Sequence, residues 1–155
     1  IVWNYNQQLL GDQIDVFMKD SLIDHAHVIG NAFSIQQLKS DTTLYNQVSS
    51  KEMFAYFIEG KIYETKAKDN VLIGYYFKEG DSVAIIYNYQ ETTEMRMFLK
   101  DRKLERVWTP KTSGTMYPHN QIPAEKKQLQ GFAWYDYIRP LNRNDIFIWR
   151  PKKKL

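Results

Sequence analysis

The chain has 155 residues, of which 43% are hydrophobic and 15% aromatic, with no cysteine and a formal net charge of +3. This length allows one domain with a moderate core. Much of the charge lies in the lysine run at residues 152–154, which favours a solvated tail over an arm that binds nucleic acid. Without cysteine, disulfides say nothing about the compartment.

The chain opens on a strand-like run, Ile1-Val2-Trp3-Asn4-Tyr5, without an initiator methionine or a basic leader region. Neither a signal peptide nor a membrane-spanning run is visible in the sequence. We therefore expect the targeting information to lie in an upstream segment outside this chain.

One short sequence pattern occurs three times, in residues 12–33, 51–72 and 94–113. Apolar residues alternate with more polar ones in the first half of each copy, which is the period of a strand with one buried face. Nine positions fall into three columns of the alignment: Ile14, Met53 and Met95; Val16, Ala55 and Met97; Met18, Phe57 and Leu99. They predict one apolar surface across three strands.

A turn follows these columns in each copy, and it contains acidic residues or glycine, which tolerate the backbone angles of tight hairpins. The return strands begin at Ile23, Ile62 and Leu104 and alternate in the same way. Each copy is therefore predicted to be a hairpin. The turns are Lys19-Asp20-Ser21, Ile58-Glu59-Gly60 and Lys100-Asp101-Arg102.

The first two copies end in turn pairs, Gly30-Asn31 and Asp69-Asn70, and a second, less regular pair of strands follows each. One hairpin alone is marginal in water, so we expect the copies to stack into an elongated antiparallel β-structure. The additional strands are predicted at 32–36 with 43–48, and at 71–77 with 82–89, the latter pair joined by a turn at 78–81.

All five prolines lie after residue 109, and proline removes a hydrogen-bond donor from a sheet. We expect the chain beyond this point to lie over the sheet rather than pair within it. Residues 119–155 are predicted to be a capping extension of the domain formed by residues 1–118. It would hold one or two helical turns at 124–129 and an aromatic run at 131–138 that plugs or caps one end of the sheet.

Residues that carry catalytic chemistry are sparse. His25 and His27 share one face of a strand, but no third metal ligand is evident in the sequence, and the other copies hold charged or aromatic residues at the matching positions. We find no nucleophile elbow, acid/base carboxylate pair or glycine-rich phosphate loop. The sequence therefore predicts a protein that is not an enzyme and that needs no metal or cofactor.

Methionine occurs four times in the apolar columns, at Met18, Met53, Met95 and Met97. Methionine fills gaps in an ordinary core, and its flexible thioether also suits a surface that accommodates variable apolar cargo. The two interpretations differ in geometry. A sheet that folds over and leaves one edge open would make the nine positions a groove, whereas a closed sheet would make them a sealed core.

Two blocks of sequence carry a resemblance to a known family. The first comprises Val2-Trp3, Gly11-Asp12-Gln13-Ile14, Ile23-Asp24 and Asn31-Ala32-Phe33; the second comprises Met116-Tyr117-Pro118, Gln121-Ile122-Pro123, the run LQGFAW at 129–134, Arg139-Pro140 and Asp145-Ile146-Phe147. Together they resemble the C-terminal region of OstA-like (organic solvent tolerance) proteins of Gram-negative bacteria. The resemblance covers nearly the whole chain, and the second block is its more specific part.

The resemblance implies a periplasmic component of lipopolysaccharide transport and outer-membrane assembly, in the periplasm or at the periplasmic face of the outer membrane. It implies an open β-jelly roll, or β-taco, whose groove holds the acyl chains of lipopolysaccharide or another envelope lipid. The implied partners are other transport-bridge or outer-membrane assembly proteins, or further copies of the chain, joined by pairing of strand edges.

Two other functions are compatible with the residues. One is a structural or scaffold β-module of a larger cell-envelope protein, with a sealed core and no lipid. The other is a carbohydrate-binding sheet that uses exposed aromatic residues, although aromatics at alternate positions more often pack across strands. The aromatic residues in question are Tyr75, Tyr87, Tyr89 and Trp108.

Overall fold

The computed structural model describes residues 1–4, 6–77, 86–101, 103–142 and 144–147. It confirms the all-β prediction, since the described chain forms one open antiparallel sheet of nine strands. The strands are β1 (Val2–Asn4), β2 (Gln7–Leu10), β3 (Gln13–Lys19), β4 (Leu22–Gln37), β5 (Tyr45–Ile58), β6 (Lys61–Phe77), β7 (Ile86–Lys100), β8 (Lys103–Trp108) and β9 (Gly114–Pro118).

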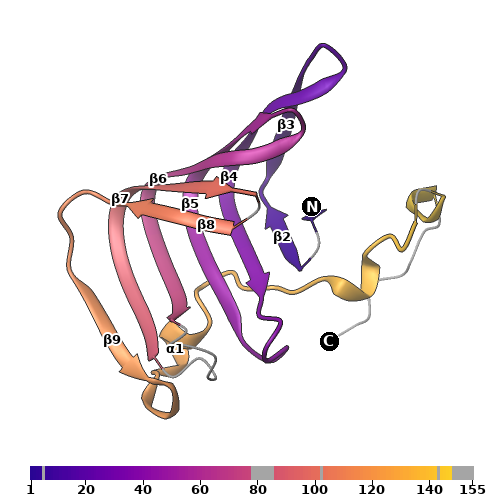
Figure 1. Cartoon of the computed structure of the whole chain (residues 1–155). Helices are drawn as coiled ribbons and strands as arrows, with labels where there is room; N and C mark the ends of the chain where they lie inside the picture. The colour runs from indigo at the N-terminus through magenta and orange to yellow at the C-terminus, as the bar shows by residue number, and fades with distance from the viewer. Residues whose placement is uncertain (5, 78–85, 102, 143, 148–155) are drawn as a thin grey trace.

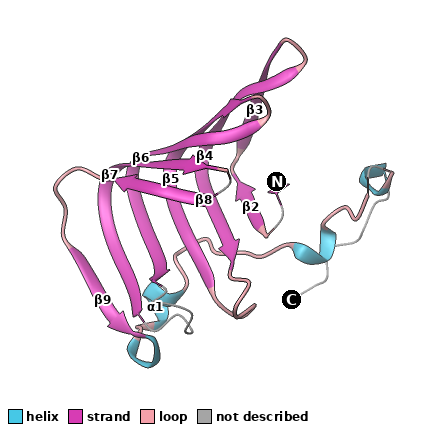
Figure 2. Cartoon of the chain, viewed as in Figure 1, coloured by secondary structure: helices cyan, strands magenta, loops and turns pink. Residues whose placement is uncertain are grey.

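Four long strands, β4 to β7, form the centre of the sheet, and shorter strands complete its two edges (Figure 2). At one edge β3 pairs with the beginning of β4 and β2 with its end, while β1 pairs with β2. At the other edge β8 pairs with the end of β7 and β9 with its beginning. The predicted turn at 78–81 and the lysines at 152–154 lie outside the described residues.

The sheet bends where its long strands carry irregularities at one common level (Figure 1). Register shifts occur between Ile29 and Ala32, between Ser49 and Glu52, and between Lys68 and Val71. We call the two sides the hairpin half and the tail half. The hairpin half contains β3, β8 and residues 22–29, 52–58, 61–68 and 94–100; the tail half contains β1, β2, β9 and residues 32–37, 45–50, 71–77 and 86–92.

The pairs Gly30-Asn31 and Asp69-Asn70 produce the bend rather than ending a strand. All four residues have positive φ, from 46° to 71°, which glycine, asparagine and aspartate tolerate better than other residues. The prediction of separate short strands on either side was wrong, because β4 and β6 continue through these pairs as bulges. A bulge bends its strand and increases the local twist.

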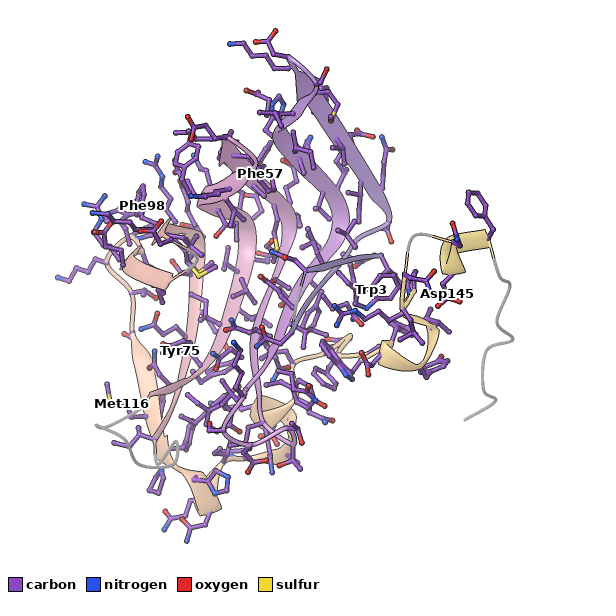
Figure 3. All side chains as sticks on the ribbon, turned by 45° about the vertical axis from the view of Figure 1, so that its right-hand side comes forward. Trp3, Phe57, Tyr75, Phe98, Met116 and Asp145 are labelled. Atoms are coloured by element: carbon purple, nitrogen blue, oxygen red, sulfur yellow. The ribbon has the colours of Figure 1, made fainter. Side chains whose placement is uncertain are left out.

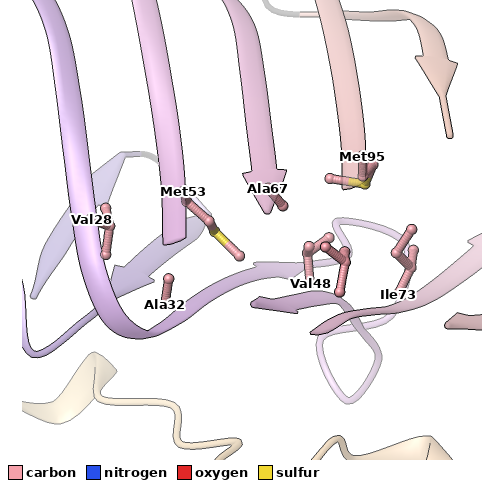
Figure 4. Packing of buried hydrophobic residues seen from close by; sticks show 8 residues of the cluster. Val28, Ala32, Val48, Met53, Ala67, Ile73 and Met95 are labelled. Carbon is pink, nitrogen blue, oxygen red and sulfur yellow. The ribbon is translucent and has the colours of Figure 1, made fainter. Parts of the chain in front are cut away.

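The inner faces of the two halves meet beside the bend (Figure 4). One buried cluster draws Val28, Met53, Ala67 and Met95 from the hairpin half, and Ala32, Val48, Val71 and Ile73 from the tail half. All eight side chains are less than one-tenth exposed. The same strands therefore supply both sides of the core.

The C-terminal segment crosses the outer face of the tail half rather than one end of the sheet. Leu129, Phe132 and Trp134 pack on Phe33, Ile35 and their neighbours. The segment contains η1 (His119–Gln121), α1 (Ala124–Lys127), η2 (Asp136–Ile138) and η3 (Asp145–Phe147). The helical turn expected at 124–129 is confirmed as α1. Pairing of β9 with β7 was not expected; its proline, Pro118, is tolerated because β9 is an edge strand.

Two buried glutamines hold this segment by its backbone. Gln8 donates through Nε2 to the Ala133 carbonyl at 2.6 Å and accepts from the Tyr135 amide at 2.7 Å. Gln47 donates to the Lys127 carbonyl at 2.8 Å and accepts from the Leu129 amide at 3.0 Å. Each side-chain amide thus satisfies one backbone donor and one backbone acceptor, as a neighbouring strand would.

A group of tyrosines secures the start of the same segment. Tyr87 donates from its hydroxyl to the Lys126 carbonyl at 2.6 Å, and the Lys126 ammonium donates to the Tyr117 hydroxyl at 2.9 Å. Burial raises the pKa of Tyr87, and burial followed by the hydrogen bond to Glu91 raises the pKa of Tyr89 to about 12. The hydrogen bond to Tyr117 raises the pKa of Lys126.

Alkaline conditions should loosen this contact. Each of these groups has a folded-state pKa above its unfolded value, so the folded state holds protons that the unfolded state has lost. The resulting stability is fully present below about pH 10, the ordinary tyrosine pKa, and falls as the pH rises toward 12. Limited proteolysis of the C-terminal segment between pH 9 and 12 would follow the release. Tyr89→Phe should reduce this dependence, whereas Tyr137→Phe, on an exposed residue, should leave it unchanged.

Candidate functional site

Two adjoining cavities lie between the inner faces of the hairpin half and the tail half, with volumes of about 330 and 390 Å³. Gln7, Ser34, Val48, Met95 and Met97 line both of them. The first extends toward β3 and the second toward β8, so together they run across the sheet. We call the two adjoining cavities together the groove; Trp3, Phe57 and Tyr75, which line it, are labelled in Figure 3.

The structure places the nine predicted positions on the inner face of the hairpin half. Met18 is the exception in that it lines neither cavity and is 60% exposed near the tip of β3. The other eight all line the groove. They are Ile14, Val16, Met53, Ala55 and Phe57 in the first cavity, Leu99 in the second, and Met95 and Met97 in both.

Exposure along these columns rises with distance from the bend. Along β3, Ile14 nearest the bend is partly buried, whereas Val16 is 49% and Met18 60% exposed. The return strand β4 shows the same trend, with Val28 at 1%, Ala26 at 8% and Ile23 at 38%. The groove is therefore closed at the bend and open to solvent toward the hairpin tips.

Two polar atoms at the groove lack a partner. Trp3 Nε1 and Thr65 Oγ1 are buried without a hydrogen bond among the described residues, and both residues line the first cavity. The sequence reasoning did not identify them. A threonine opposite Ala55 in an otherwise apolar column was the available signal for Thr65.

Polar side chains line the tail-half wall of the second cavity, where the hairpin-half wall is apolar. The apolar side includes Met97, Leu99, Leu104 and Val107. The polar residues with uncharged amide or hydroxyl side chains on this wall, which the sequence reasoning also missed, are Gln7, Ser34, Gln36, Asn46, Gln47, Asn88 and Gln90. The sequence feature that could have indicated them is the spacing of polar residues two apart within one strand, as in Asn88 and Gln90.

On the outer face of the hairpin half, the two histidines contact neighbouring aromatic and acidic side chains. The His25 ring stacks on Phe17 with centroids 4.3 Å apart, and its Nδ1 lies 2.7 Å from Asp24 Oδ2. His27 stacks on Phe54 at 4.2 Å. Among the described residues, no three histidine or carboxylate side chains come together as possible metal ligands.

The four aromatic residues considered for carbohydrate binding do not form one exposed platform. Tyr87 is fully buried, so the prediction that it is exposed was wrong; its ring lies between the sheet and the C-terminal segment. Tyr89 is partly covered by Lys126, whose Nζ lies 4.7 Å from its ring centre. Tyr75 faces the groove, and Trp108 is exposed at the edge strand β8.

Comparison with known proteins found no matching family model, no matching curated protein and no matching solved structure. None of the helices in the described part of the chain is long and apolar enough to span a membrane.

Proposed function

We propose that this protein is a non-enzymatic lipid carrier of the cell envelope, acting in lipopolysaccharide export and outer-membrane assembly in the periplasm or at the periplasmic face of the outer membrane. The acyl chains of lipopolysaccharide or a related envelope lipid would lie in the groove. In this proposal the bent sheet is an open β-jelly roll, or β-taco, built from three hairpin repeats and covered by its C-terminal segment.

The rise in exposure from the bend to the hairpin tips is the observation that carries the proposal. It leaves apolar inner-face side chains such as Val16, Ile23 and Val107 exposed to water. Covering hydrocarbon is worth about 0.8 kcal/mol for each methylene removed from water. An acyl chain lying along these side chains would bury both surfaces at once.

The strand edges supply the proposed protein contacts. In the described chain, β3 is paired only with β4 and β8 only with β7, so each leaves one side of its backbone available. An extended strand can add to such an edge. We propose that another envelope transport or assembly protein, or a second copy of this chain, pairs there.

Site-specific photocrosslinking tests the lipid proposal. A photoreactive residue at Met97 or Val16, both lining the groove, should capture lipopolysaccharide in cells. The alternation of the strand supplies matched controls, since Phe98 and Phe17 are neighbours that point to the outer face, where they stack on Arg106 and His25. Capture at neither Met97 nor Val16 in a functional protein, or equal capture at the control positions, would contradict the proposal.

The scaffold interpretation gives the opposite expectation. A module that only extends a larger envelope protein would carry no lipid at any inner-face position. Met53 and Met95 lie in the buried cluster beside the bend, where a sealed core is expected under either interpretation. The crosslinkers are therefore placed farther from the bend, at Met97 and Val16.

A further inference from the structure

A row of uncharged amide side chains crosses the tail half of the groove. Gln7 pairs with Gln36 across the strands, and Gln36 pairs with Asn46. On the other side of the row Asn88 pairs with Tyr75. Gln90 lies two residues beyond Asn88 on the same face of β7. These five residues, Gln7, Gln36, Asn46, Asn88 and Gln90, all line the second cavity, and we call them the amide row.

Formal charge is missing from this part of the groove. Among the described residues that line the second cavity, none is acidic or basic. The first cavity includes one charged residue, Lys66, and its ammonium lies 3.0 Å from Glu94 Oε1. A bound anion would therefore meet no unpaired cation among the described lining residues.

The opposite wall of the second cavity is hydrocarbon, contributed by Met97, Leu99, Leu104 and Val107. A ligand between the two walls would contact apolar side chains on one side and amides on the other. Carboxamides both donate and accept hydrogen bonds, and so do hydroxyl groups and other amides. An ionised group placed there would lose water without gaining a countercharge, which is costly.

We infer that the second cavity takes the uncharged part of the lipid's headgroup beside the acyl chains, rich in hydroxyl or amide groups as in an acylated sugar, and leaves ionised groups outside the groove. The hydrocarbon lies against Met97 and Leu99, and the sugar hydroxyls or acyl amides bond to the amide row. The inference rests on the proposed function, because it assumes that the groove takes acyl chains. It adds the class of headgroup that the second cavity recognises.

Two detergents with the same alkyl chain test this. n-Dodecyl-β-maltoside carries a neutral sugar and n-dodecyl sulfate an anion, and each is titrated into the whole chain below its critical micelle concentration by calorimetry. The maltoside should bind at least tenfold more tightly. Replacing Gln36 and Gln90 together with leucine should weaken maltoside binding about tenfold and change sulfate binding less than twofold.

Gln130→Leu, an exposed glutamine on the C-terminal segment, is the matched control and should change neither affinity. Equal affinity of the native protein for both detergents would overturn the inference while leaving acyl binding intact. This comparison uses the native protein alone, so it does not depend on the folding of a variant. Unchanged maltoside binding in the double variant would overturn it as well. If the native protein binds neither detergent, the proposed function fails, and the inference fails with it.

Discussion

Gln47→Leu should lower the free energy of unfolding by about 3 kcal/mol and release the C-terminal segment. Gln47 is 2% exposed, and its amide group bonds to both the Lys127 carbonyl and the Leu129 amide. Leucine fills similar space but pairs with neither group, and each buried polar group left unpaired costs about 1–3 kcal/mol.

Urea unfolding followed by circular dichroism would measure the loss of stability, and limited proteolysis would report release of the segment. Gln130→Leu provides the control for exchanging an exposed glutamine, and we expect it to shift stability by no more than about 0.5 kcal/mol. A urea midpoint for Gln47→Leu equal to that of the native protein would show that the two hydrogen bonds of Gln47 do not hold the segment in place.

A second large effect is expected from Gly74→Val, which should destabilise the protein by about 3 kcal/mol or more. A Cβ atom at Gly74 would lie 1.9 Å from the Tyr87 hydroxyl and 2.8 Å from its Cζ. Tyr87 is fully buried and passes beneath Gly74 to reach the Lys126 carbonyl. Any side chain at Gly74 must therefore displace the ring and break that hydrogen bond.

A double-mutant cycle with the smaller change Gly74→Ala isolates this contact. In a Tyr87→Leu background the obstruction is gone, so Gly74→Ala should cost much less than it does in the native background. Thermal unfolding of the four proteins measures the coupling. Equal costs in the two backgrounds would mean that Gly74 is needed for the strand itself and not for Tyr87.

The strands β3, β5 and β7 were predictable because a strand that is buried on one face alternates apolar with more polar residues. Val16 and Phe17 point to opposite faces for that reason, and so do Met97 and Phe98. The bend was not predictable, because residue pairs such as Gly30-Asn31 and Asp69-Asn70 are found both in hairpin turns and in bulges. Only the continued pairing of β4 and β6 on both sides, a long-range property, distinguishes the two.

The same limit applies to the C-terminal segment and to the polar wall of the groove. Gln8 binds the backbone of a residue 125 positions away, and nothing local distinguishes it from Gln7, which faces the groove. The amide row combines residues from β2, β4, β5 and β7. Each looks like an ordinary exposed polar position in its own strand, and only the bend brings the apolar wall over them.

The bend also makes the two walls of the groove one continuous piece of backbone. β4, β5, β6 and β7 each cross from one wall to the other, so the walls cannot slide past each other while the ladders remain paired. An insertion on one side of the bulges would change which residues face inward on that wall alone. The apolar wall and the amide wall can therefore diverge independently in sequence, and under the proposed function such a change would alter the headgroup that the sheet accepts without altering the wall that contacts the acyl chains.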